Sequence, residues 1–88
     1  MYFEWDEKKA QSNLRKHEVD FADAVTVFED QLALTLLDDH PDEERYVTIG
    51  RDATGKLLVV IYAPLRDGLR IISARNATKR EREEYEKK

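Results

Sequence analysis

The stretch Lys56–Ala63, KLLVVIYA, decides the fold. Its centre, Leu57–Ile61, is an unbroken apolar run of strand length, which predicts a strand central in its sheet or buried on both faces. We therefore expect Val59 and Ile61 in the core. Thr54-Gly55 supplies the turn into this strand, and Pro64 is expected to end it because proline has no N–H for the ladder.

Strands are predicted on both sides of this run. Arg45–Arg51 alternates, with Val47 and Ile49 on one face and Tyr46 and Thr48 on the other. After the Asp67-Gly68 turn, Leu69–Arg75 forms a third long strand. The hairpins imply antiparallel pairing. Two shorter strands are expected further out, at Leu32–Leu37, before an acidic loop, and at Tyr2–Trp5.

Three helices complete the predicted α+β fold. Asp6 caps a helix to about Lys16, with Ala10 and Leu14 inward. Asp20 caps a second helix with the clearest amphipathic stripe, and a polar C-terminal helix follows from Asn76 to Lys88. The members of the stripe are Phe21, Ala24, Val25 and Phe28.

The C-terminal helix has little to bury. Thr78 and Glu81 form a capping box. Opposite charges recur four residues apart at Lys79–Glu83, Arg80–Glu84 and Arg82–Glu86. A helix this polar is marginal alone, so we expect it to dock through Tyr85 or to be held by a partner.

Length and composition limit the function. The 88 residues predict one domain, 1–88, with 41% hydrophobic and 39% charged residues. There is no cysteine for disulfides or thiolate ligation, no apolar run long enough to cross a membrane, and no signal-peptide pattern at the start. A cytoplasmic protein without membrane association is expected.

The charge is unevenly distributed along the chain. Residues 1–44 carry 4 Lys/Arg against 13 Asp/Glu, whereas residues 45–88 carry 11 against 6. This asymmetry is compatible with one surface for polyanions and another for a cationic partner, or with solvated surface alone.

No pattern for a cofactor or metal is present, so none is expected. The sequence has no H-E-x-x-H spacing, no phosphate-binding glycine loop and no nucleophile elbow. His40 with Asp39 and Asp42 is more simply a solvated loop than a loose cation site. These negatives argue against nucleotide hydrolases and most metalloenzymes.

Arginine, lysine and histidine remain as candidate chemistry. RNA cleavage without a metal needs a base for the ribose 2′-hydroxyl, an acid for the leaving oxygen and fixed cations at phosphorus. Arginine suits the last role and histidine the first two. Surface ion pairs for the arginines, and a helix-capping role for His17, are the structural alternatives. Trp5 and Tyr2 are candidates for base stacking, although tryptophan in so small a chain is more often core.

The two ends of the chain carry a recognisable pattern. The opening has the form W-D-x-x-K-A-x-x-N-L-x-K-H, and the last strand reads R-I-I-S-A-R. Both blocks, in order and at the right separation, resemble the BrnT family of toxins, and the likeness covers essentially the whole chain. Two positions depart from the family pattern: Glu18 stands where glycine is usual, and Asn76 where a basic residue is frequent.

This resemblance implies a RelE-like fold, with two N-terminal helices packed on a twisted, mostly antiparallel sheet. It also implies a ribonuclease toxin of a type II toxin–antitoxin system, which arrests growth by cutting RNA. The implied partner is a BrnA-like ribbon-helix-helix antitoxin, and the complex would bind operator DNA mainly through that antitoxin. A catalytically weak co-repressor that mainly holds the antitoxin is the alternative.

We predict that the active groups belong to one pool of cationic and titratable residues. Arg70 and Arg75 lie five apart on one strand, so they point to opposite faces unless the strand bulges. Arg75 is favoured, because it ends a strand and leads into the helix N-terminus at Thr78. The pool is Lys9, Lys16, His17, Arg45, Arg66 and Arg75.

Overall fold

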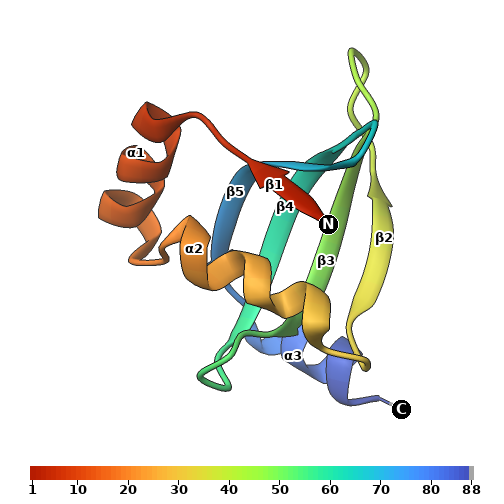
Figure 1. The fold of residues 1–88 in the computed structure, drawn as a ribbon. Helices are drawn as coiled ribbons and strands as arrows, with labels where there is room; N and C mark the ends of the chain where they lie inside the picture. The colour runs from red at the N-terminus through yellow and green to blue at the C-terminus, as the bar shows by residue number, and fades with distance from the viewer. Residues whose placement is uncertain (88) are drawn as a thin grey trace.

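A computed structural model describes residues 1–87, so the predicted helix end at Lys88 lies outside the described residues. One five-stranded sheet has the order β1-β5-β4-β3-β2 (Figure 1). The strands are β1 (Tyr2–Glu4), β2 (Leu34–Asp38), β3 (Arg45–Arg51), β4 (Leu57–Leu65) and β5 (Gly68–Asn76). The helices are α1 (Glu7–His17), α2 (Phe21–Ala24), the 3-10 helix η1 (Val25–Glu29) and α3 (Lys79–Glu86).

Strand β4 is central, as the apolar run predicts. Leu57, Leu58, Val59 and Val60 are all buried, and β4 pairs antiparallel with β3 and with β5. Ile61 is only half-buried, so the predicted core position is confirmed for Val59 and only in part for Ile61.

The predicted end of β4 at Pro64 is wrong. The strand continues through Pro64, opposite Leu69, to Leu65. Within residues 1–87, the last β4 residue paired with β3 is Tyr62, so beyond it β4 pairs with β5 alone. A missing N–H is tolerated at such an edge.

Strand β1 pairs parallel to β5, whereas the other three strand pairs are antiparallel, so the sheet is mixed and mostly antiparallel, as expected. Tyr2 lies opposite Gly68, and a Cβ at Gly68 would overlap the carbonyl of Tyr2. A glycine at this position therefore allows the first strand to approach the last one.

Helices α1 and α2 and η1 cover one face of the sheet (Figure 1). The predicted second helix is split, since α2 gives way to η1 after Ala24. The prediction of Leu14 as an inward residue is wrong: it is 46% exposed, and Asn13 is buried beside Ala10. Trp5 is partly buried and packs edge-to-face on Phe21, which supports its reading as core.

Helix α3 packs on the opposite face of the sheet. Tyr85 is buried against Ile49, Leu57 and Val59, which confirms the predicted docking residue. Its hydroxyl donates to Asp30 Oδ2 at 2.6 Å, and the predicted capping box is present. Of the three predicted charge pairs, that between Arg82 and Glu86 forms, at 3.8 Å.

Glu18 ends α1 in the left-handed conformation, with φ 58° and ψ 33°, and its N–H donates to Leu14 O at 2.9 Å. This region strains residues with a Cβ. We expect Glu18→Gly to raise the free energy of unfolding by about 0.5–1 kcal/mol, measured by urea denaturation. Gln11→Gly, an exposed control in the middle of the same helix, should lower it by about 1 kcal/mol. A destabilised Glu18→Gly protein would contradict this account.

Candidate functional site

A β-bulge in β5 changes which side chains share a face. Tyr62 of β4 pairs with Ile71 and Ile61 pairs with Ser73, so Ile72 is an extra residue. Arg70 lies opposite Ala63 and Arg75 opposite Val59, two β4 residues of the same face. Because of this bulge, Arg70 and Arg75 lie on the same face of the sheet, together with Ser73. This is the face on which α3 packs.

The outer edge of β5 is closed by a side chain. Among the described residues, strand β1 pairs with Gly68–Arg70 alone, and beyond it the Asn13 side chain of α1 bonds the β5 backbone. Asn13 Nδ2 donates to Ala74 O at 2.8 Å and to Val19 O at 3.0 Å, and Ala74 N–H donates to Asn13 Oδ1 at 3.1 Å. Asn13 thus takes the place of a neighbouring strand and fixes α1 against β5.

Three of the predicted site residues, Lys9, Lys16 and His17, meet beside this edge. They line an open pocket of about 200 Å³ whose other wall is Ile72 and Ser73 at the bulge. Ser12 and Asn13 complete the lining and were not predicted. The spacing of Lys9, Ser12, Asn13 and Lys16 puts them on one helix face, which is a signal the sequence contains.

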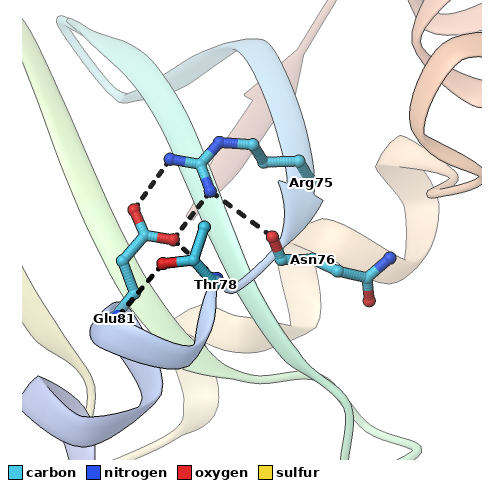
Figure 2. A network of polar contacts seen from close by, with 4 residues as sticks. All are labelled: Arg75, Asn76, Thr78 and Glu81. Carbon is cyan, nitrogen blue, oxygen red and sulfur yellow. Dashed lines mark hydrogen bonds and ion pairs between the residues drawn. The ribbon is translucent and has the colours of Figure 1, made fainter.

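Arg75 is held by a carboxylate (Figure 2). Its Nη1 and Nη2 donate to Oε1 and Oε2 of Glu81 at 2.7 and 2.8 Å, and Nη1 also contacts Asn76 O at 3.4 Å. The Thr78 N–H donates to Glu81 Oε1 at 2.9 Å. Chiefly because of the Arg75 hydrogen bonds, the pKa of Glu81 falls to about 2. The pair joins the end of β5 to the first turn of α3.

Arg45 lies apart from the pocket. Its Nε donates to Glu43 Oε1 at 2.7 Å, and Arg70 Nη2 donates to Glu43 Oε2 at 2.9 Å. Arg66 is exposed in the turn between β4 and β5. The six predicted residues therefore lie in four separate places. Lys9, Lys16 and His17 line the pocket, Arg45 is paired with Glu43, Arg75 is paired with Glu81, and Arg66 lies in the turn.

Within residues 1–87, no group of three or more His, Cys, Asp or Glu side chains is placed to hold a metal ion. The backbone N–H of Asp42 donates to His40 Nδ1 at 3.2 Å, within the acidic loop. None of the described helices is long and apolar enough to cross a membrane.

Both the fold and the sequence of the chain are similar to those of ribonuclease toxins. In fold the chain is similar to a ribonuclease toxin, the BrnT of Brucella abortus, with a TM-score of 0.67 and 29% identity over 90% of this chain and 99% of that one. The family model for "Ribonuclease toxin, BrnT, of type II toxin-antitoxin system" matches residues 5–81. The chain belongs to the BrnT family, and that membership implies an antitoxin partner. No curated protein matches the chain.

Proposed function

We propose that this chain is an endoribonuclease toxin with a RelE-like fold, which cuts RNA without a metal ion and thereby arrests growth. The observation that carries the proposal is the pocket where Lys9, Lys16 and His17 face the bulge of β5. Arg75 lies two residues beyond Ser73 on the same strand. Cationic and proton-transferring groups thus flank one short segment of β5.

The proposed roles follow from the chemistry of each side chain. His17 transfers protons between the ribose 2′-hydroxyl, the leaving oxygen and water, since an imidazole has one nitrogen that can accept a proton and one that can donate it. Lys9 and Lys16 bind the flanking phosphates. Arg75 exchanges Glu81 for the reacting phosphate and stabilises its added charge through its planar fork. Arg66 takes no part in this scheme.

The proposed partner is a BrnA-like ribbon-helix-helix antitoxin, and the complex binds operator DNA mainly through it. Support comes from the edge strand β2, where Leu36 and Leu37 are 58% and 70% exposed. Such residues beside an open strand edge are typical of protein interfaces. The acidic stretch that begins with Asp38 suits a cationic partner segment.

One observation favours a second candidate, a catalytically weak co-repressor. Both terminal nitrogens of Arg75 are bound to Glu81, and Arg45 and Arg70 share Glu43. In that candidate function the arginines stabilise the fold, and the chain serves mainly to hold the antitoxin on its operator.

One experiment separates the two functions. We expect induced expression to stop growth and co-expression of the antitoxin to restore it. The purified chain should cleave RNA equally well with EDTA and with added Mg²⁺, because its own side chains supply the proton transfer and the positive charge. A metal-dependent nuclease assayed alongside is the control. Cleavage that stops in EDTA would refute the metal-independent mechanism, and a chain that never cleaves RNA would establish the co-repressor.

A further inference from the structure

Glu43, in the segment between β2 and β3, is bound by two arginines from different strands. Arg45 comes from β3 and Arg70 from β5, with β4 between them. We propose that Arg45 and Arg70 form a binding position for a backbone phosphate of single-stranded RNA, which Glu43 occupies when no RNA is bound. This inference rests on the proposed RNA substrate and adds a second contact to it, away from the α1 pocket.

The geometry of the Glu43 carboxylate fits a phosphate. Each of its two oxygens accepts one hydrogen bond, from Arg45 Nε at 2.7 Å and from Arg70 Nη2 at 2.9 Å. A phosphodiester also presents two non-bridging oxygens, and arginine pairs with carboxylate and phosphate in the same fork geometry. The two guanidinium groups are therefore already spaced for one bridging anion.

The electrostatics agree with this geometry. The Arg45 hydrogen bond is the main reason that the pKa of the Glu43 carboxyl lies below its usual range. The carboxylate is therefore negative at neutral pH, and it neutralises part of the charge that a phosphate would meet.

The position lies on the same face of the sheet as Arg75. Arg70, Ser73 and Arg75 follow one another along β5 on this face because of the bulge. Helix α3 covers the face at Ile49, Leu57 and Val59, at one end of the sheet, whereas the segment with Glu43 lies at the other (Figure 1). An RNA strand that contacts Arg75 and continues along β5 on this face would pass the half-buried Ser73 and then meet Arg70.

Between the two ends, the face carries an apolar row from three neighbouring strands. Leu36 pairs with Val47, and Val47 pairs with Ile61. Leu36 is exposed and the other two are half-buried. Single-strand binders combine cations for phosphates with apolar or aromatic surface for the bases, and this face offers both.

The ion pairs of Glu43 are partly exposed to solvent, so its carboxylate can be displaced. The side chains of Glu43, Arg45 and Arg70 are 33%, 25% and 41% exposed. Ion pairs at such exposure contribute little net stability, because water screens and solvates the separated charges. Exchange of the carboxylate for a phosphate therefore requires little free energy.

The test uses the whole chain and a short 2′-O-methyl oligonucleotide, which binds as RNA does but has no 2′-hydroxyl to cleave. We expect Glu43→Gln to tighten binding by about three- to fivefold, because the competing charge is removed. Arg45→Ala and Arg70→Ala should each weaken binding about five- to tenfold and lower the salt dependence by about 0.7 in log–log slope. The matched controls on α3, Glu84→Gln and Arg82→Ala, change the same charges at the far end of the sheet.

A second measurement reads the site directly. The ¹⁵N–¹H signals of Arg45 Nε and Arg70 Nε should shift on titration with the oligonucleotide, whereas that of Arg82 should not. The proposal is overturned if Glu43→Gln changes affinity only as much as Glu84→Gln. It is equally overturned if the arginine signals move only when the antitoxin is added, which would assign the pair to a protein interface.

Binding is measured without catalysis, so the two proposals fail separately. Arginine-dependent binding by a chain that does not cut the unmodified strand would keep this site and refute the nuclease. Cleavage that does not depend on Arg45 or Arg70 would keep the nuclease and refute this site.

Discussion

Replacement of Asn13 by alanine is expected to lower the free energy of unfolding by about 2–4 kcal/mol, because buried backbone groups lose their partners. The Asn13 amide satisfies the N–H and carbonyl of Ala74 and the carbonyl of Val19. Alanine would leave these groups without their side-chain partner. Urea denaturation followed by circular dichroism measures the loss.

Two further variants make the Asn13 prediction specific. Asn13→Asp keeps the shape but lacks the two donors for the Ala74 and Val19 carbonyls, so it should also be destabilising at neutral pH. Gln11→Ala changes an exposed residue of the same helix and should stay within about 0.5 kcal/mol of the wild type. An Asn13→Ala protein as stable as Gln11→Ala would show that the edge of β5 is not held in this way.

Replacement of Arg75 by alanine is expected to reduce RNA cleavage by about 10²–10³-fold, the usual loss when one donor to a developing charge is removed. The variant also breaks the pair with Glu81, so folding must be checked. Glu81→Gln is the matched variant, because it weakens the same pair and leaves the arginine in place. If Arg75 acts on the phosphate, Glu81→Gln keeps its cleavage activity while Arg75→Ala loses it.

Circular dichroism and antitoxin binding serve as controls for both Arg75 and Glu81 variants. A folded Arg75→Ala protein with wild-type cleavage would remove Arg75 from the mechanism. Equal losses in the two variants, with equal loss of stability, would assign the pair a structural role.

The central strand and the docking of α3 follow from local patterns. An apolar run such as Leu57–Val60 has to be buried, and Tyr85 is the large apolar residue of a polar helix, so each is informative by itself. The parallel pairing of β1 was not predictable in this way. It depends on contacts between residues more than sixty positions apart, for which the local sequence carries no periodicity.

The candidate site was predictable in its residue types but not in its arrangement. Lys9, Lys16 and His17 meet in one pocket because helical spacing brings them to one side of α1. The common face of Arg70 and Arg75 depends on one unpaired residue, Ile72, and a bulge leaves little trace in an apolar strand. The carboxylates that bind the arginines come from a loop and a helix, and their pairing is decided by tertiary packing.

The parallel pairing of β1 with β5 also determines how early the sheet can be completed during translation. The ribosome makes Tyr2–Glu4 first, but their partners, Gly68–Arg70, come near the end of the chain. The Asn13 side chain likewise has no backbone partner in β5 until Ala74 has been synthesised. Domains fold as units once their long-range contacts are available. A nascent chain shorter than about 75 residues therefore lacks a closed sheet edge, and the α1 pocket has no second wall until translation is almost complete.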